Sequence, residues 1–356
     1  MRIVVAMSGG VDSSVAAALL REQGHDVIGL SMQLYDQRGA QGGTETFGRC
    51  CTLDDLHDAR RVAAALGVPH YIVNFERQFD ETVISNFVRE YASGRTPLPC
   101  ARCNSDLKFS TLVDRAIGFG AEHVATGHYA RVERREDGRW LLRRSRDRHK
   151  DQSYFLFSLT QAQLARARFP VGDLTKPQVR DEARRLGLDV AEKPDSQEIC
   201  FVPDGDYATF VEAKAPAALQ GGPIVDEHGT TIGEHGGVHR FTVGQRKGLG
   251  IAAPAPLYVL KLDAETSTVV VGARQSLERT TLTASGVNWI SIPPPAEWCR
   301  VDAQIRHRHA AAPGRVRALA DGRAALEFDS PQPAISPGQA VVFYDGDLVV
   351  GGGWIE

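Results

Sequence analysis

A short polar turn near the start of the chain has the residue types of a phosphate-binding site. The letters S-G-G-V-D-S at residues 8–13 follow an apolar run directly and precede a segment with helical periodicity. Gly9 and Gly10 can adopt φ > 0 and let the backbone approach a ligand closely, while Ser13 or Ser14 can cap the helix that follows. The amides of such a turn and the positive helix end favour a phosphate. Asp12 would repel a phosphate, so it predicts a Mg²⁺ ion between its carboxylate and the phosphates.

Two cysteines have the surroundings of reactive thiols. Cys103 ends a proline-bearing loop at 94–104, before an expected helix whose N-terminus would lower the pKa of the thiol. Cys200 also lies beside turn residues, whereas inert cysteines usually lie inside apolar elements. Cys100 completes a C-x-x-C with Cys103, but a structural zinc site would need a second pair.

The remaining cysteines give weaker signals. Cys50 and Cys51 are adjacent and cannot easily face one site together, so we expect them in the core or in a loop near the predicted phosphate site. Cys299 follows Trp298 in a β-rich region and is expected in the core.

Basic residues gather at 143–150 and again at 306–309. Such runs are usually solvated surfaces, but beside a phosphate site and reactive thiols they favour contacts with a nucleic-acid backbone. The segment at 150–155, K-D-Q-S-Y-F, mixes charge, amide and aromatic groups suited to an unstacked nucleotide.

The elements that must position these residues alternate between strands and helices in the first half of the chain. The hydrophobic pattern predicts strands at 3–6, 27–32, 70–73 and 123–126, and helices at 54–66, 80–91, 108–117, 161–168 and 176–186. This order predicts an α/β fold with a doubly wound parallel sheet and ligands at the carboxyl ends of its strands. After residue 204, short β-rich runs between glycines and prolines predict small antiparallel barrels.

Length and composition exclude several classes of protein. A chain of 356 residues with 42% apolar and 24% charged residues is typical of two or three globular domains. No apolar run reaches membrane length, and residues 1–3 enter a strand at once, so we expect no membrane span and no signal peptide. Six cysteines indicate catalytic or metal-binding thiols in a cytoplasmic protein rather than a disulfide scaffold. A net charge of −3 means that any nucleic-acid binding needs local basic patches.

The turn at 8–13 resembles the PP-loop of ATP pyrophosphatases, which split ATP into AMP and pyrophosphate. Six motifs in order extend the resemblance to essentially the whole chain, which resembles the bacterial tRNA-specific 2-thiouridylases. They are S-G-G-V-D-S at Ser8, C-N-S-D-L-K-F at Cys103, A-T-G-H-Y-A at Ala125, K-D-Q-S-Y-F-L at Lys150, D-S-Q-E-I-C-F at Asp195 and F-T-V-G-Q-R-K-G-L-G at Phe241.

The resemblance implies a role for each matching residue. Cys200 would carry sulfur as a persulfide, and Cys103 would be the nucleophile that forms a transient disulfide with it. Contacts with ATP are implied for Ala6, Met7, Ser8, Gly9, Gly10, Val11, Asp12, Ser13, Met32 and Gly127. Contacts with tRNA, the first three with the target base, are implied for Leu98, Pro99, Cys100, His128, Lys150, Asp151, Gln152, Arg306, His307 and Gln339. Some family members have Asp at the position of Cys100.

The implied enzyme thiolates the wobble uridine of tRNA, with ATP and Mg²⁺ as cofactors. Its implied partners are the tRNA anticodon stem-loop and a sulfur donor, either a persulfide-donating relay protein or a cysteine desulfurase. The implied domains are an ATP and thiol domain at 1–205, a central β-rich domain at 206–280 and a tRNA-binding β-barrel at 281–356.

Three alternatives stay open at this point. An iron–sulfur cluster on Cys100, Cys103 and Cys200 would replace the persulfide route. A PP-loop ligase or amidotransferase would not need the cysteine pair, and a tRNA-binding or sulfur-carrier protein would release no pyrophosphate.

Overall fold

The computed structural model describes residues 1–35, 53–195, 199–202, 205–216 and 220–356. These residues divide into two compact units. Unit 1 comprises Met1–Val83, Cys100–Gly205 and Asp347–Val349, and unit 2 comprises Ile84–Pro99, Asp206–Gly346 and Val350–Glu356. Within the described ranges, no helix combines the length and apolar character needed to cross a bilayer.

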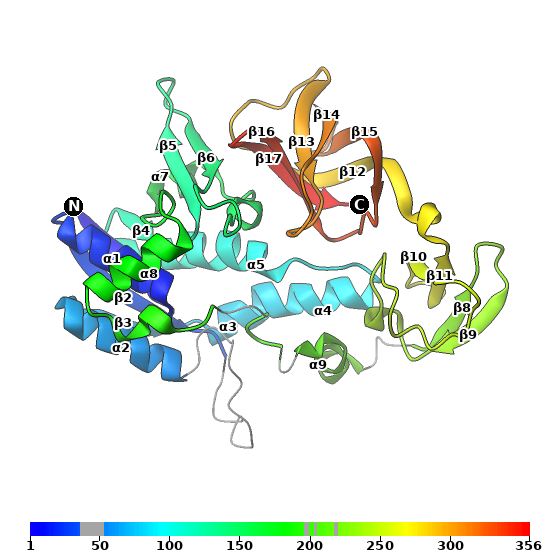
Figure 1. Cartoon of the computed structure of the whole chain (residues 1–356), viewed down its shortest axis with the longest axis horizontal. Helices are drawn as coiled ribbons and strands as arrows, with labels where there is room; N and C mark the ends of the chain where they lie inside the picture. Colours follow the sequence, from blue (N-terminus) through cyan, green and yellow to red (C-terminus); the bar gives the residue numbers. More distant parts are fainter. Residues whose placement is uncertain (36–52, 196–198, 203–204, 217–219) are drawn as a thin grey trace. The chain divides into compact units, whose positions relative to one another are not determined.

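Unit 1 is built on a five-stranded sheet in the order β3-β2-β1-β4-β7, and every neighbouring pair is parallel (Figure 1). The predicted parallel α/β fold is therefore confirmed. Its strands are β1 (Arg2–Ala6), β2 (Asp26–Gln33), β3 (His70–Asn74), β4 (His123–Ala125) and β7 (Ala167–Arg168).

Three helices supply much of the core around this sheet. They are α1 (Val11–Glu22), α2 (Leu53–Leu66) and α8 (Lys176–Arg185), and α1 packs against both of the others. The small residues Ala16, Ala17 and Ala18 of α1 are buried, which allows close packing. On α2, Ala59, Val62, Ala63 and Leu66 follow the helical period and are all buried. Burial of each of the larger aliphatic side chains stabilises the fold by about 1.5–3 kcal/mol.

Two long helical runs contain wider π-helical turns that the sequence pattern does not reveal. The first consists of α3 (Glu76–Phe79), η2 (Asp80–Ile84) and α4 (Ser85–Ala92). The second consists of α5 (Pro99–Arg102), η3 (Cys103–Thr111) and α6 (Leu112–Gly118). The expected loop at 94–104 is thus wrong in its second half, because Pro99 starts a helix, where proline is well tolerated.

The rest of unit 1 forms short elements around the sheet. The expected helix at 161–168 ends at Arg166, because its last two residues pair with β4 as strand β7. A hairpin of β5 and β6 was not predicted from the sequence. The bounds are β5 (Ala130–Arg134), β6 (Trp140–Arg144), η4 (Ser153–Phe155), α7 (Gln161–Arg166) and η5 (Asp189–Glu192).

Unit 2 contains the β-rich part of the chain. Its middle part has a four-stranded sheet in the order β10-β11-β8-β9. The elements there are α9 (Tyr207–Lys214), β8 (Gly222–Val225), β9 (Thr231–His235), η8 (Val238–Arg240), β10 (Tyr258–Asp263), β11 (Thr268–Gly272) and η9 (Arg274–Leu277).

The carboxyl-terminal part is a β-barrel of six antiparallel strands, as the sequence predicted. The strands are β12 (Glu278–Trp289), β13 (Cys299–Gln304), β14 (Ala312–Ala318), β15 (Ala324–Pro333), β16 (Ala340–Asp345) and β17 (Leu348–Ile355). Cys299, which was expected in the barrel core, is half-buried and packs against that core from its edge.

Candidate active site

The turn between β1 and α1 is shaped by Gly9, one of the two glycines that the sequence singled out, whereas Gly10 has a φ of −90°. Gly9 has φ +74°, and a Cβ on it would lie 2.1 Å from the backbone oxygen of Asp55 in α2. Only glycine can meet both conditions. The turn therefore lies directly against the first residues of α2.

The serines of the turn do not cap α1, so that expectation is wrong. Gly10 is the N-cap residue and no side chain caps the helix. The hydroxyls of Ser13 and Ser14 instead donate to the Gly10 carbonyl at 3.1 Å and 2.9 Å. The first-turn amides of α1 consequently lack a side-chain acceptor, and this leaves a helix end suited to an anion.

Lys193 connects the turn to α2. No sequence motif identified it as a site residue. Its ammonium lies 3.1 Å from the Gly9 carbonyl and 2.6 Å from carboxylate oxygens of Asp55 and Asp58. Burial alone would lower the pKa of Lys193, but the two carboxylates outweigh it and raise the pKa. Because the partners lie about 135 residues or more away in sequence, only the fold reveals this contact.

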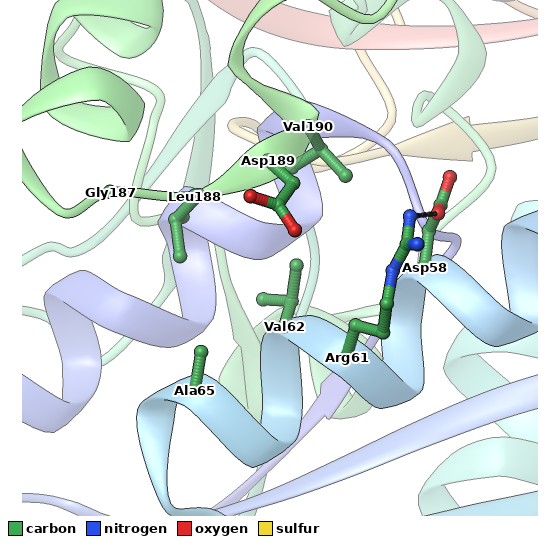
Figure 2. A pocket seen from close by; sticks show the side chains of 8 residues that line it. All are labelled: Asp58, Arg61, Val62, Ala65, Gly187, Leu188, Asp189 and Val190. Carbon is green, nitrogen blue, oxygen red and sulfur yellow. Dashed lines mark hydrogen bonds and ion pairs between the residues drawn. The ribbon is translucent and has the colours of Figure 1, made fainter.

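A pocket beside this cluster is formed by α2 and the segment at 187–190 (Figure 2). Arg61 and Asp58 form an ion pair at its edge, with a distance of 2.5 Å. Its other lining residues are Val62, Ala65, Gly187, Leu188, Asp189 and Val190. None of the residues predicted to bind ATP or tRNA lines it, so we do not assign it to the active site.

Both carboxylate oxygens of Asp12, the second residue of α1, contact neighbouring side chains. The ammonium of Lys176 lies 2.8 Å and 2.9 Å from its two carboxylate oxygens, and the Tyr129 hydroxyl donates to one of them at 2.7 Å. Burial, and then the Asp12 charge, raise the pKa of Tyr129 and keep this hydroxyl a donor.

These surroundings do not fit a magnesium ion resident on Asp12. Both oxygens already face the Lys176 ammonium, whose positive charge opposes a second cation there. Separately, within the described ranges no three His, Cys, Asp or Glu side chains are grouped to hold a metal ion. The same observation applies to Cys100, Cys103 and Cys200, whose grouping does not fit an iron–sulfur cluster. Magnesium that arrives bound to ATP belongs to the substrate.

The other residues expected around ATP lie at the same edge of the sheet. A Cβ on Gly127, just after β4, would lie 2.5 Å from the Ser13 nitrogen and 2.6 Å from the Asp12 carbonyl carbon. Met32 is buried in β2, two residues beyond Leu30, whose carbonyl accepts a hydrogen bond from the Met7 amide at 2.9 Å. The structure thus gathers the end of β1, the start of α1, β2 and the end of β4.

Both thiol segments pack on the same short helix. Cys103 is buried at the start of η3, and η3 contacts α3. Cys200 is half-buried, and the ring of the next residue, Phe201, meets Phe79 of α3 edge-on, with centroids 5.5 Å apart. Cys100 is exposed one helical turn before Cys103. Cys50 and Cys51 lie outside the described residues.

The residues of unit 1 that were expected to meet tRNA also hold the site together. Lys150 pairs with Asp195 at 2.6 Å. Asp151 accepts from the Ser145 amide at 2.9 Å and pairs with Arg144. The Gln152 side chain accepts from the Tyr129 amide at 2.9 Å.

The basic run at 143–150 is extensively paired within the protein. Arg143 pairs with Glu133, Arg144 with Asp151 and Arg148 with Asp347. The number of basic residues in this run therefore overstates the charge that it offers to a nucleic acid.

Three of the predicted tRNA residues of unit 2 lie near the ends of barrel strands. Arg306 donates to the Pro333 carbonyl at 3.1 Å, and His307 is exposed. Gln339 donates to the carbonyls of Thr96 and Pro97, both at 3.1 Å. Gln339 therefore fixes the segment that leads into the buried Leu98 and into Pro99, the first residue of α5.

His128 is held as a neutral ring. Its Nδ1 lies 2.7 Å from the Thr126 hydroxyl, and it stands edge-on to Phe169. Burial, and then the nearby Lys108 charge, lower its pKa well below the usual value. His128 thus offers a polar, uncharged face to a ligand at neutral pH.

Comparisons with known protein families match three successive parts of the chain. Residues 1–204 match the tRNA methyl transferase HUP domain, 208–273 the tRNA methyl transferase PRC-barrel domain and 279–355 the aminomethyltransferase β-barrel domain.

Curated relatives match along the full length. The chain is similar to the tRNA-specific 2-thiouridylase MnmA of Geotalea uraniireducens (strain Rf4), with 55% identity over 100% of this chain and 95% of the relative. It is also similar to the protein of the same name from Halothermothrix orenii, with 45% identity over 100% of this chain and 99% of the relative.

Solved structures match more distantly. A 4-thiouridine synthetase–RNA complex with bound ATP aligns with a TM-score of 0.36 and 15% identity, over 61% of this chain and 51% of that one. The NMN synthetase of Francisella tularensis aligns with a TM-score of 0.32 and 16% identity, over 54% and 64%. We base no argument on these alignments.

The close packing at Gly127 generates a first prediction. Gly127→Ala should lower the affinity for ATP roughly 10- to 100-fold, because overpacking against main-chain atoms costs about 1–3 kcal/mol. Isothermal titration calorimetry with ATP and Mg²⁺ would measure this. The matched control is Gly118→Ala in α6, where a Cβ meets nothing within 4 Å. Parental affinity in Gly127→Ala would show that the end of β4 does not shape the ATP site.

The half-buried ring of His128 generates a second prediction. Since its folded pKa lies below the usual 6.5, the unfolded chain binds the extra proton first. The free energy of unfolding should therefore be at its full value above pH 6.5 and fall as the pH drops toward the folded pKa, by up to about 1.4 kcal/mol per pH unit. Urea unfolding at several pH values should show a shallower loss in His128→Gln than in the parent. Equal slopes would contradict the prediction.

Proposed function

The chain belongs to the family of tRNA-specific 2-thiouridylases, and on that premise we propose that it thiolates the wobble uridine of tRNA through an adenylated base and a protein persulfide. The enzyme would replace the C2 oxygen of uracil with sulfur and release AMP and pyrophosphate. The observation that supports this most is the uncapped amino end of α1 in the same unit as two thiol segments that pack on α3.

The first step would activate a poor leaving group. The C2 oxygen of uracil attacks the α-phosphorus of ATP, the bond from that phosphorus to the β-bridging oxygen breaks, and pyrophosphate leaves. The amides at the start of α1 and the turn at Gly9 suit the phosphates. Tyr129 and Lys176 orient Asp12 beside them.

The second step would transfer sulfur. The terminal sulfur of a Cys200 persulfide attacks C2, and AMP leaves with the original oxygen. The Cys103 thiolate then attacks the Cys200 sulfur, and the sulfur–sulfur bond to the base breaks. Its electrons stay on the 2-thiouridine, and Cys103 and Cys200 become a disulfide. An external thiol reductant must supply two electrons before the next turnover.

The names of the matching family models suggest methyl transfer to tRNA as another candidate. Methyl transfer from a methyl donor consumes no thiol pair and does not need cleavage of ATP. The glycine turn at an uncapped helix and the two thiol segments favour thiolation over it.

The proposed partners follow from this chemistry. The wobble base lies in a single-stranded anticodon loop, so it can be flipped into a site at modest cost. The sulfur would come from a persulfide-donating relay protein or a cysteine desulfurase, to which the half-buried Cys200 would have to become accessible. Because tRNA and ATP are its substrates, we also propose a cytoplasmic location.

A third prediction separates the thiols. Cys103→Ser and Cys200→Ser should each retain ATP and tRNA binding but lose thiolation, since one thiol carries sulfur and the other releases it. Cys100→Ser should retain most activity, because the exposed Cys100 would only line the base site. Mass spectrometry of nucleosides from reacted tRNA would measure the product.

The iron–sulfur alternative gives a different outcome. Each of the three variants would then be inactive to the same degree. Each would also lack the stoichiometric iron that the parent protein would contain after anaerobic purification. That combination would overturn the persulfide route.

A fourth prediction concerns tRNA. Arg306→Ala should weaken tRNA binding and reduce the slope of log affinity against log salt by roughly 0.7–0.9 for one lost phosphate contact. ATP affinity without tRNA should stay at the parental value. Arg323→Ala is the matched control, because Arg323 lies in the same unit and is half-exposed in an ion pair with Glu356. Unaltered tRNA affinity in Arg306→Ala would remove this residue from the interface.

A further inference from the structure

A lysine that the sequence reasoning did not consider lies at the amino end of α1. Lys176 is the first residue of α8, and its side chain is only 10% exposed. Besides both oxygens of Asp12, its ammonium contacts a carboxylate oxygen of Asp195 at 2.7 Å. One buried ammonium thus bridges two carboxylates from distant parts of unit 1.

Local sequence explains why Lys176 is held there. Thr175 caps α8, and its hydroxyl and the Gln178 side chain form a reciprocal capping box. The Lys176 amide donates to the Asp147 carboxylate at 2.9 Å. With its backbone fixed in this way, the side chain can extend to α1, against which α8 packs (Figure 1).

The Lys176 ammonium lies beside the uncapped first turn of α1, because it pairs with Asp12, the second residue of that helix. Lys150 and Arg180 pair with Asp195 next to it, and the Asp147 carboxylate accepts from the Lys176 amide. The three cations and the three carboxylates balance, so the cluster as a whole carries no excess charge. The positive helix end and the ammonium next to it attract the phosphates of ATP.

We propose that Lys176 is a further phosphate-binding residue of the adenylation step and that Asp12 is the residue that positions it. This inference rests on the proposed function. The Lys176 ammonium contacts the β-phosphate and stabilises the negative charge that develops on pyrophosphate as the α-phosphorus–oxygen bond breaks. Asp12 acts through Lys176 rather than through a metal ion, because its oxygens already hold the ammonium.

The experiment compares four variants of the full-length protein: Lys176→Met, Lys176→Arg, Asp12→Asn and the double variant Asp12→Asn/Lys176→Met. Calorimetry measures the binding of inorganic pyrophosphate, and a single-turnover assay with ATP, Mg²⁺ and tRNA measures pyrophosphate release. Circular dichroism and urea unfolding identify any variant that fails to fold. The control is Lys261→Met, the same change at a side chain that is 69% exposed in unit 2.

We expect Lys176→Met to weaken pyrophosphate binding at least tenfold and to slow its release on the order of 100-fold. Lys176→Arg should retain part of the pyrophosphate affinity and part of the release rate, because arginine keeps the positive charge. The double variant should be no slower than the worse single variant, since both changes remove one interaction. It also leaves no unpaired ammonium or carboxylate at this position, so it stays informative if Lys176→Met does not fold. The Mg²⁺ concentration for half-maximal rate should be the same in Asp12→Asn and the parent.

Three results would overturn the inference. Parental pyrophosphate binding and release in folded Lys176→Met, or in the folded double variant, would make Lys176 structural only. If the parent protein bound no pyrophosphate, Lys176 would not form a phosphate-binding site. A higher Mg²⁺ requirement in Asp12→Asn would make Asp12 a metal ligand. A parent that binds pyrophosphate but releases none with tRNA would instead contradict the proposed function, and the binding arm would still test Lys176.

Discussion

Main chain packed against main chain at the amino end of α1 is the constraint on which the site depends. Gly9 lies against the Asp55 carbonyl, and Gly127 lies against the backbone of Asp12 and Ser13. Backbone atoms cannot rotate away as a side chain can, so neither position tolerates a methyl group without a shift of a whole segment. The turn, α2 and the end of β4 are therefore fixed relative to one another before any charged side chain contributes. Lys193 and Lys176 are then held around this contact by carboxylates.

The sequence predicted what local pattern determines. Four of the five parallel strands of unit 1, the helices α2 and α8 and most barrel strands follow from periodicity and from the glycines and prolines between elements. The glycine turn could be recognised because φ > 0 and close approach both require glycine. One prediction was wrong because of a partner distant in sequence: Ala167 and Arg168 become a strand only because β4 lies beside them. The predicted serine cap was wrong for a local reason, because the hydroxyls of Ser13 and Ser14 donate to the nearby Gly10 carbonyl.

In the candidate site too, the local sequence identifies some residues, and only the fold identifies the others. Residues in motifs could be named from the sequence, whereas Lys176 and Lys193 could not, because their carboxylate partners lie 164 and 138 residues away. Residues expected to meet tRNA, such as Asp151 and Gln152, proved to bond within the protein as well. Position in a motif therefore does not distinguish a group that touches a substrate from one that holds its neighbour. Only the fold shows which of these residues hold their neighbours.

The bonds from Gln339 to Thr96 and Pro97 have a consequence for synthesis of the protein. The two partners are separated by 243 and 242 residues, and Gln339 directly precedes the last two strands. A ribosome that adds roughly 5–20 residues per second needs about 10–50 s to make that interval. During this time the nascent chain already contains the complete glycine turn and Cys103, while the segment before Leu98 lacks its support. Translation itself thus delays the assembly of the segment that is expected to contact the base until the polypeptide is almost finished.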